Sequence, residues 1–479
     1  MKLMKKLTAL LLTLVMVLGM GSVVHASEAT TGTGKITINN AIDGQTYSIY
    51  RILELESYIT EGNHAYKATA SWKDFFTTGE GKNYLTIDDS GIVTSSTNLS
   101  TANAAAFAKA ALAYAKANTN TITNDGTDIA RGASVTFNNL PLGYYLVDSS
   151  TGALCSLDTT ADTATIEEKN GVPSVEKKVD NVNANTANIG QTVTFTTTIT
   201  AKPGAEKYVL HDKMTDGLTF DGTVTVKKGT GTVEETEYTF TKTGLADGCT
   251  FEIAFEPNFC NTLKADETIT VTYTAKLNEN AVIAENGNTN TTWLSYGDNS
   301  NTNVATTTTK TFALPVYKFT KGTPNTTAAL PGVTFTLSEN ENGTNSIALV
   351  KTSDAEAGKP ESADVYRHAK DGETGTVTAV TTPATGRFTI QGLKAGTYYL
   401  TETATVTGYN KLTAPVTVVI DKDGKVSVGG KETPTVEIEN KTGSLLPSTG
   451  GRGTMAFYIV GALLVLGSGV VLITKKRMR

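Results

Sequence analysis

Apolar and polar residues alternate through most of the chain between residues 27 and 442. Segments such as Thr192 to Thr196 and Val416 to Ile420 are typical of half-buried strands, because strand side chains point alternately to the two faces of a sheet. The stretch from Thr101 to Asn118 differs, since it is rich in Ala and its apolar residues recur at helical spacing. The pattern predicts an all-β protein with an Ala-rich helix inserted in its first domain.

Two shifts in composition divide this region. One is the extended stretch Gly171-Val172-Pro173, and the other is the run from Gly297 to Lys310, which is rich in Asn and Thr. With 479 residues the chain exceeds one core of ordinary size. We therefore expect three domains, at 27–170, 171–305 and 306–442.

The amino-terminal segment predicts export. Lys2, Lys5 and Lys6 precede an apolar run from Leu7 to Leu18, and Val24-His25-Ala26 forms a small-residue cleavage site. We expect residues 1–26 to be a signal peptide. The alternative is an N-terminal membrane anchor, although the apolar run is shorter than the about 20 residues that a span requires.

The carboxyl-terminal segment 443–479 contains three features in a fixed order. Leu446-Pro447-Ser448-Thr449-Gly450 comes first, followed by the uncharged apolar run 455–473 and a basic tail that includes Lys475, Lys476 and Arg477. The run is long enough to cross a bilayer, and the basic tail favours a cytoplasmic end. The order resembles the LPXTG sorting signal of sortase substrates. That resemblance implies cleavage after Thr449 and covalent attachment to the cell wall, and the alternative is a plain single-pass membrane protein.

Composition excludes several classes of protein. The net charge of −6 argues against a nucleic-acid partner. The three cysteines, Cys155, Cys249 and Cys260, are too few for a disulfide framework, and Cys249 and Cys260 either pair or stay free. The four histidines show no metal-ligand spacing, and the chain has neither a nucleophile elbow nor a phosphate loop. We expect no cofactor, no metal and no enzymatic activity, with a surface hydrolase as the least supported alternative.

Longer segments resemble known surface domains. The third segment contains 316–321, 330–335, 396–403 and 436–440, and it resembles the collagen-adhesin B-type domain of Gram-positive surface proteins. The second segment, with 176–180, 211–214 and 290–296, resembles the A-type domain found in pilin shafts. Both are immunoglobulin-like β-sandwiches. The whole chain is thus similar to a sortase-assembled backbone pilin.

This resemblance implies a spontaneous isopeptide bond in each of the two domains, between a Lys on the first strand and an Asn on the last, assisted by a carboxyl group. Strand alternation places one such set on the predicted inner face in each case. The expected bonds and their acids are Lys177–Asn290 with Asp212 and Lys321–Asn440 with Glu402. Lys178 is the competitor in the middle domain, but it alternates onto the opposite face.

Burial explains why such groups would react. An apolar site lowers the pKa of a Lys and raises that of a carboxyl group, so a neutral amine faces a protonated acid. The alternative for each set is a buried ion pair with a hydrogen-bonded Asn, which needs no reaction. In the first domain Lys35 and Asp148 imitate such a pair, but no Asn completes it, and we expect no crosslink there.

A polymerised shaft subunit also needs an exposed Lys that attacks the acyl group at Thr449 of another subunit. Backbone pilins carry it in a Tyr-Pro-Lys-Asn motif, and this chain has Glu167-Glu168-Lys169-Asn170 at the corresponding boundary. The resemblance makes Lys169 the intersubunit lysine, although only Lys-Asn of the motif is present. The implied partners are a sortase, identical subunits in a head-to-tail polymer, and peptidoglycan or a basal pilin. A monomeric wall-anchored adhesin or accessory pilin that binds a host or matrix ligand is the main alternative.

Overall fold

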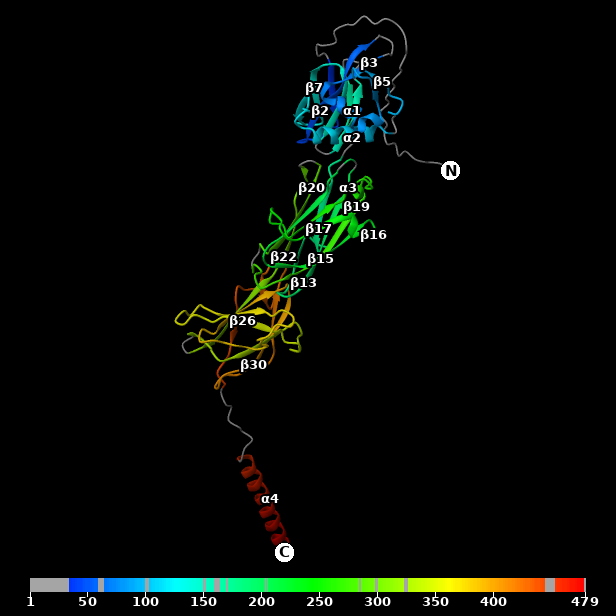
Figure 1. Ribbon diagram of the computed structural model, residues 1–479. Coiled ribbons are helices and arrows are strands. Elements are labelled where there is room, and N and C mark those ends of the chain that lie inside the picture. Colours follow the sequence, from blue (N-terminus) through cyan, green and yellow to red (C-terminus); the bar gives the residue numbers. More distant parts are fainter. Residues whose placement is uncertain are drawn as a thin grey trace, which may run out of the picture. The chain divides into compact units, whose positions relative to one another are not determined.

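The computed structural model describes residues 34–58, 64–99, 103–149, 152–158, 164–168, 171–202, 204, 206–283, 286–297, 300–322, 326–443 and 453–477 (Figure 1). It divides into two compact units. One comprises Met1–Phe312 with Gly392–Lys394, and the other comprises Ala313–Gln391 with Ala395–Arg479. The predicted signal peptide, residues 1–26, lies outside the described part of the chain.

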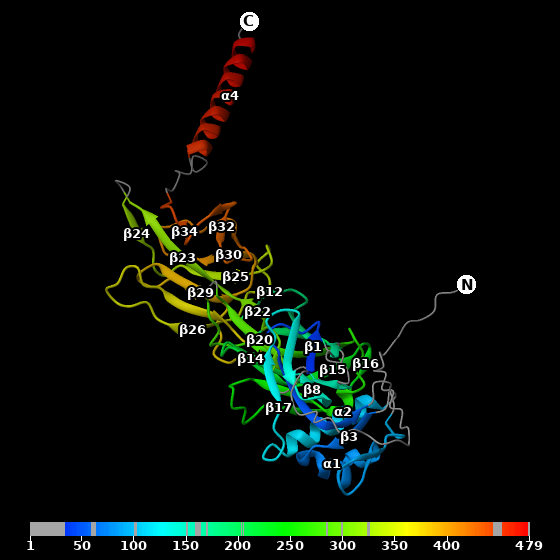
Figure 2. The ribbon, with the colours of Figure 1, turned by 90° about the horizontal axis from the view of Figure 1, so that it is seen from above.

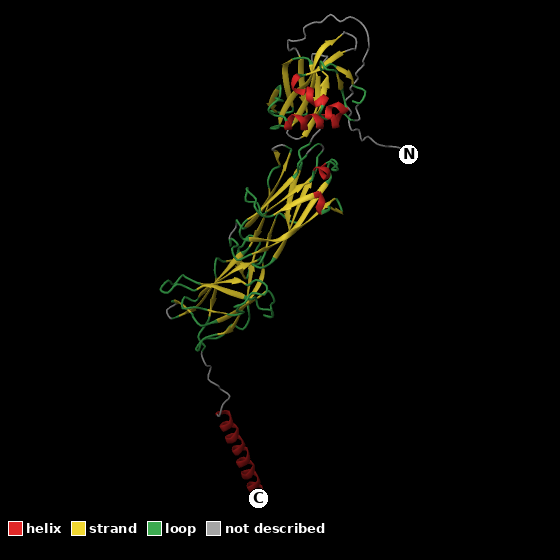
Figure 3. Cartoon of the chain, in the orientation of Figure 1, coloured by secondary structure: helices red, strands yellow, loops and turns green. Residues whose placement is uncertain are grey.

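The first part of the amino-terminal unit combines strands with short helices, and most of the helical segments in Figure 3 belong to it. Its sheets have the orders β10-β1-β7, β3-β2-β8-β9 with β6 beside β2, and β4-β5. The elements are β1 (Gly34–Asn39), β2 (Thr46–Tyr58), β3 (His64–Ala68), η1 (Ala70–Trp72), α1 (Lys73–Thr77), η2 (Glu80–Asn83), β4 (Thr86–Ile87), β5 (Val93–Ser95), α2 (Ala104–Ala117), β6 (Gly126–Ile129), β7 (Ser134–Leu140), β8 (Gly143–Ser149), β9 (Gly152–Asp158) and β10 (Ala164–Glu167).

Helix α2 is the Ala-rich helix, and it is shorter than the predicted range at both ends. Phe107 and Ala111 are fully buried on its inner side, and Tyr114 packs against the same core. Phe107 lies 5.3 Å from Tyr84 between ring centroids, and Tyr114 lies 5.1 Å from Phe75. The apolar stripe thus has the role that its helical spacing predicts.

The second part of this unit is a sandwich of two sheets around one hydrophobic core. Their strand orders are β11-β13-β19-β15-β16 and β12-β22-β20-β14-β18-β17, with β21 beside β20. The elements are β11 (Ser174–Val179), β12 (Ala184–Thr186), β13 (Thr192–Thr200), β14 (Val209–Met214), β15 (Leu218–Lys228), β16 (Gly231–Thr232), η3 (Glu235–Glu237), β17 (Tyr238–Thr241), β18 (Phe251–Phe255), α3 (Pro257–Cys260), β19 (Thr268–Leu277), β20 (Asn288–Tyr296), β21 (Ser300–Asn301) and β22 (Ala305–Lys310).

Strand β13 shows how the sequence forms this sandwich. Val193, Phe195, Thr197 and Ile199 are buried, while the intervening Thr residues are exposed or half-buried. The β-branched residues on both faces suit a pleated, half-buried strand. Phe195 pairs across the sheet with Tyr273 of β19, and their rings stack 5.6 Å apart.

The carboxyl-terminal unit contains a further sandwich. Its sheets have the orders β24-β23-β29-β27-β26, with β34 beside β23, and β28-β25-β30-β31-β32-β33 (Figure 2). The strands are β23 (Phe312–Lys321), β24 (Thr327–Ala329), β25 (Thr334–Ser338), β26 (Leu349–Ser353), β27 (Asp364–His368), β28 (Val380–Thr381), β29 (Arg387–Leu393), β30 (Gly396–Ala404), β31 (Val416–Ile420), β32 (Val426–Val428), β33 (Lys431–Glu432) and β34 (Val436–Glu439).

The boundary between the second and third segments lies later than predicted. Strand β22, at Ala305–Lys310, pairs with β20 and β12 and so belongs to the middle sandwich. The two units meet in sequence at Phe312, not at residue 305. The Asn- and Thr-rich composition that suggested a boundary reflects a strand with Thr on both faces, since Thr307 and Thr309 are buried and Thr306 is exposed.

The chain ends in helix α4 (Gly453–Arg477), which includes the predicted span 455–473. Residues Phe457–Arg477 have a mean hydropathy of 2.3 and are long and apolar enough to cross a membrane. Lys475, Lys476 and Arg477 lie in its last turn. The sorting pentapeptide at 446–450 lies outside the described residues.

Candidate functional site

Three strands, β11, β14 and β20, each bring one polar side chain into the core of the middle sandwich. Lys177 lies on β11, Asp212 on β14 and Asn290 on β20, and they are 4%, 0% and 0% exposed. Strand alternation explains their burial, because Lys177 and Val179 share the inner face of β11. The structure therefore brings together the three residues that the sequence predicted for this domain.

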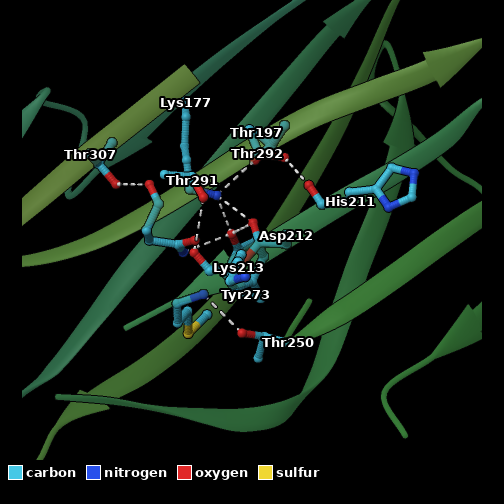
Figure 4. Close-up of polar contacts among 12 residues, drawn as sticks. Lys177, Thr197, His211, Asp212, Lys213, Thr250, Tyr273, Thr291, Thr292 and Thr307 are labelled. Atoms are coloured by element: carbon cyan, nitrogen blue, oxygen red, sulfur yellow. Dashed lines mark hydrogen bonds and ion pairs between the residues drawn. The ribbon is translucent and has the colours of Figure 1, made fainter. Parts of the chain in front are cut away.

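The side-chain nitrogen of Lys177 is surrounded by oxygen atoms and aromatic rings. Its Nζ lies 2.5 Å from Asp212 Oδ2 and 3.3 Å from Thr197 Oγ1, and it also donates to the Tyr273 hydroxyl. Figure 4 shows Lys177, Asp212 and Tyr273 converging between the strands. The ring centroids of Tyr273 and Phe195 lie 5.1 and 5.5 Å from Nζ.

Tyr273 connects the members of this site, and the sequence did not single it out. Its hydroxyl accepts from Lys177 and, at 3.1 Å, from Asn290 Nδ2, and it donates to Asp212 Oδ2. A hydroxyl has one proton and two lone pairs, so all three positions are used. Burial and the neighbouring Asp212 raise the pKa of Tyr273, so the hydroxyl keeps its proton.

Asn290 and Asp212 each leave one side-chain oxygen without a partner. Among the described residues, neither Asn290 Oδ1 nor Asp212 Oδ1 accepts a hydrogen bond, although both are buried. An unsatisfied buried polar atom is costly and calls for an explanation. An amide bond with Lys177 would keep the Oδ1 oxygen of Asn290, so this atom needs a donor, which a protonated Asp212 can supply.

Burial shifts the pKa values of both titratable groups at this site toward their neutral forms. Burial lowers the pKa of Lys177, and the attraction of Asp212 only partly offsets that effect. Burial likewise raises the pKa of Asp212, against the opposing influence of Lys177. A neutral amine is a nucleophile, and a protonated carboxyl group is a hydrogen-bond donor to a carbonyl oxygen.

A second site of the same kind lies in the carboxyl-terminal sandwich. Lys318 on β23, Glu402 on β30 and Asn440, which follows β34, are 0%, 2% and 1% exposed. Lys318 Nζ donates to Asn440 Oδ1 and lies 3.4 Å from Glu402 Oε2. Asn440 Nδ2 donates to Glu402 Oε1 at 2.6 Å and to Thr405 Oγ1 at 2.8 Å.

Burial is again the main electrostatic effect at this second site. It lowers the pKa of Lys318, although Glu402 opposes the shift. The Phe335 ring centroid lies 5.7 Å from Lys318 Nζ. The amine, the carboxyl group and the amide carbonyl therefore meet in an apolar environment, as they do in the middle sandwich.

The prediction that Lys321 provides the amine of this domain is wrong. Its side chain is 48% exposed and lies 3.6 Å from Glu439. The alternation along β23 was read from Tyr317 and Phe319, but the inner face carries Leu314, Val316 and Lys318, and Phe319 is buried next to Lys318. Tyr317 is only half-buried, and the Arg387 guanidinium packs 3.9 Å from its ring centroid.

The remaining predicted residues are placed as follows. Asp148 lies 3.4 Å from Lys116 Nζ, so a lysine other than Lys35 is its ion-pair partner. Cys249 and Cys260 are free thiols. Lys169, Thr449 and the rest of the sorting pentapeptide lie outside the described part of the chain.

Three family models match consecutive parts of the chain. Residues 189–300 match the Gram-positive pilin backbone subunit 2, Cna-B-like domain, and residues 316–434 match the SpaA prealbumin-like fold domain. Residues 438–478 match the LPXTG cell wall anchor motif. No curated protein sequence matches the chain.

Solved structures share this architecture. The T6 backbone pilin of Streptococcus pyogenes serotype M6 has 16% identity and a TM-score of 0.52, covering 83% of this chain and 81% of its own. The major pilin SpaA of Corynebacterium diphtheriae has 16% identity and a TM-score of 0.50, covering 85% and 100%. At this identity the likeness establishes the fold, which is a series of immunoglobulin-like sandwiches.

Fold, family matches and anchor together define a class of secreted proteins that are attached to the Gram-positive cell wall. Within that class, the chain carries a Gram-positive pilin backbone domain and is a structural subunit of a sortase-assembled pilus.

Proposed function

We propose that this pilin is polymerised through Lys169 and Thr449 and braced by isopeptide bonds in two successive sandwiches, as a non-enzymatic filament that supports adhesion or colonisation. The observation that carries the proposal is the repeated buried set of an amine, a carboxyl group and an Asn amide. The structure of the diphtherial major pilin is described as pointing to a modular pilus assembly with stabilizing isopeptide bonds.

The intramolecular reaction follows from the positions of the groups. The neutral amine of Lys177 attacks Cγ of Asn290, and a carbon–nitrogen bond forms. The bond from Cγ to Nδ2 breaks, and ammonia leaves with a proton that passes from the amine through Asp212. Lys318, Glu402 and Asn440 have the equivalent roles in the other sandwich.

The intersubunit bond rests on the sorting signal. A sortase cysteine attacks the carbonyl of Thr449 and releases the segment that begins at Gly450. The amine of Lys169 in another subunit then attacks the thioester, which forms an amide and frees the sortase thiol. At the base of the filament, peptidoglycan or a basal pilin supplies the amine instead.

The glutamates before Lys169 have other partners, which supports its role as a nucleophile. Glu167 accepts hydrogen bonds from Asn39 and Asn40 at 3.0 and 2.7 Å. Glu168 is buried beside Tyr47. The pKa of Tyr47 is raised mainly by its own burial, and also by the charge of Glu168 and a hydrogen bond to it. Both carboxylates are thus oriented by groups within the first domain.

The decisive experiment replaces Lys169 by Ala in cells that express the matching sortase. Wall extracts of the wild type should contain a covalent ladder of high-mass species, and the variant should give monomer only. Lys178→Ala is the matched control, because Lys178 is a nearby lysine with a partly exposed side chain that donates to Asn183. A ladder that persists in Lys169→Ala contradicts the proposed linkage, and a monomeric wild type favours an accessory pilin or a single anchored adhesin.

A further inference from the structure

Four side chains of different chemistry meet on the outer face of the middle sandwich. His211 lies on β14 and Glu252 on β18, where the two residues are cross-strand partners. Asp247 and Cys249 lie in the loop that precedes β18. One potential ligand atom from each of the four lies within 4.8 Å of the others.

These atoms are spaced as ligands around a single ion would be. His211 Nδ1 lies 2.9 Å from Glu252 Oε1 and 3.1 Å from Asp247 Oδ2. Cys249 Sγ lies 3.0 Å from Asp247 Oδ2 and 4.0 Å from His211 Nδ1. Ligand atoms bound about 2.0–2.3 Å from a tetrahedral zinc ion lie about 3–4 Å from one another, which agrees with these separations.

The far side of the imidazole determines which nitrogen can bind a metal. Ser295 Oγ donates its proton to Asn301 Oδ1 at 2.6 Å, and it lies 2.9 Å from His211 Nε2. Because the hydroxyl proton is already used, Nε2 must carry the hydrogen of that second bond. The proton on Nε2 leaves Nδ1, which faces the other three residues, as the ligand atom.

The imidazole is also held in place. Its ring stacks on Trp293 of β20 with centroids 4.9 Å apart and an interplanar angle of 2°. Figure 4 shows the His211 ring directed away from Lys177 and Asp212, as alternation along β14 requires. The cluster is therefore separate from the isopeptide site, although the neighbouring residue of the same strand belongs to that site.

No lysine or arginine side chain among the described residues neutralises the carboxylates of the cluster. Among the described residues, no Lys or Arg forms an ion pair with Asp247 or Glu252, and Lys213 Nζ reaches only the backbone oxygen of Asp247, at 3.5 Å. Two carboxylates beside an imidazole nitrogen and a thiol thus leave an excess of negative charge. A bound cation would neutralise it.

We propose that His211, Asp247, Cys249 and Glu252 bind a divalent transition-metal ion of the zinc class. Nitrogen and sulfur donors disfavour Mg²⁺ and Ca²⁺, which prefer oxygen ligands, and favour Zn²⁺ or Co²⁺. On binding, the Cys249 thiol releases its proton to solvent and coordinates as a thiolate. The metal ties the loop before β18 to β14, on the face opposite Asp212.

This proposal is independent of polymerisation and crosslinking, and metal binding itself tests it. The purified full chain, held in detergent, reduced and freed of metal, is titrated with Co²⁺ and then with Zn²⁺. We expect a single equivalent of Co²⁺ to give a thiolate-to-cobalt charge-transfer band and tetrahedral d–d bands. Zn²⁺ should abolish both, because it displaces Co²⁺ and has a filled d shell.

Matched variants assign the ligands. Cys249→Ser should remove the charge-transfer band, whereas Cys260→Ser should retain it. Ser295→Ala should weaken Co²⁺ binding by about 10- to 100-fold, since it removes the group that orients His211. Circular dichroism checks that each variant is folded. A wild type without the charge-transfer band, or a band that survives Cys249→Ser, overturns the proposal.

Discussion

Lys318 Nζ donates a hydrogen bond to Asn440 Oδ1 in the core of the carboxyl-terminal sandwich. The same amide donates through Nδ2 to Glu402, so the amine and the acid approach opposite ends of one side chain. In the middle sandwich the Tyr273 hydroxyl links the amine, the amide and the acid instead. It accepts hydrogen bonds from Lys177 and Asn290 and donates one to Asp212. The two sites therefore share three residue types but differ in how the amide is held.

Intact mass should assign the amine of the carboxyl-terminal bond. We expect the folded wild type to lack two ammonia equivalents, one for each site. Lys318→Ala should restore the mass of one ammonia, after correction for the substitution, because it removes the buried amine. Lys321→Ala, which removes a half-exposed lysine of the same strand, should leave the mass deficit unchanged. A deficit that disappears only in Lys321→Ala would show that the wrong lysine has been assigned.

The carboxyl-terminal crosslink should make a large contribution to stability. Lys318 and Asn440 are 122 residues apart, and a covalent link of that length stabilises a fold by about 5 kcal/mol through the lost entropy of the unfolded chain. Asn440→Ala should therefore lower the free energy of unfolding of this sandwich by about 5 kcal/mol or more. Denaturant unfolding followed by the fluorescence of the unit's tyrosines measures it.

Asn342→Ala is the control for that measurement, because Asn342 is exposed and its hydrogen bonds with described residues stay within its own turn. It should have little effect. Without a covalent bond, Asn440→Ala would cost only the hydrogen bonds of one buried amide, about 1–3 kcal/mol. A loss in that smaller range would contradict a crosslink at this site.

Tyr273 should accelerate bond formation in the middle sandwich. Tyr273→Phe retains the ring that packs on Phe195 but removes the hydroxyl that positions Lys177, Asp212 and Asn290. Because small misplacements of reacting groups are costly, we expect ammonia loss to slow by about 100-fold. A time course of intact mass measures it when refolding starts from chain made unfolded in inclusion bodies, in which the bond has not yet formed. Tyr208→Phe removes another buried hydroxyl, which accepts a hydrogen bond from the Lys202 backbone N–H, and it should leave the rate unchanged.

The sequence predicted these sites unequally, for physical reasons. The burial of Lys177, Asp212 and Asn290 on one inner face follows from sequence, because β11, β14 and β20 alternate without interruption. Strand β23 breaks that rule, since Lys318 and Phe319 are buried in succession near its end. The run Leu314, Val316, Lys318 would have given the correct face. No pattern distinguishes Tyr273 from an ordinary core aromatic residue on β19.

The outer-face cluster shows a different limit of sequence reasoning. Its four members come from a strand, a loop and a neighbouring strand, so their sequence spacing carries no metal-ligand pattern. Only the pairing of His211 with Glu252 across β14 and β18 brings them together. Lys169 and Thr449 stay predictions from sequence, since both lie outside the described residues.

Asp212 should give an unusual pH dependence when the crosslink is blocked. In Asn290→Ala the amine and the acid remain buried but cannot react. Burial raises the pKa of folded Asp212 above its ordinary 3.8, so its contribution to stability is fully present below that value. This contribution to stability is lost as the pH rises through the raised pKa that Asp212 has in the folded state. An ion pair would give the opposite trend, because a depressed carboxyl pKa stabilises the fold at higher pH.

The double variant Asn290→Ala/Asp212→Asn isolates this effect. The free energy of unfolding of each variant is measured by urea denaturation from below pH 3.8 to neutral pH. We expect the single variant to lose stability relative to the double variant as the pH rises, because only the single variant has a carboxyl group that must stay protonated in the fold. If the single variant instead becomes more stable than the double variant as the pH rises, Lys177 and Asp212 form a charged pair. The amine would then be protonated before the reaction, and bond formation would first require a proton transfer from Lys177 to Asp212.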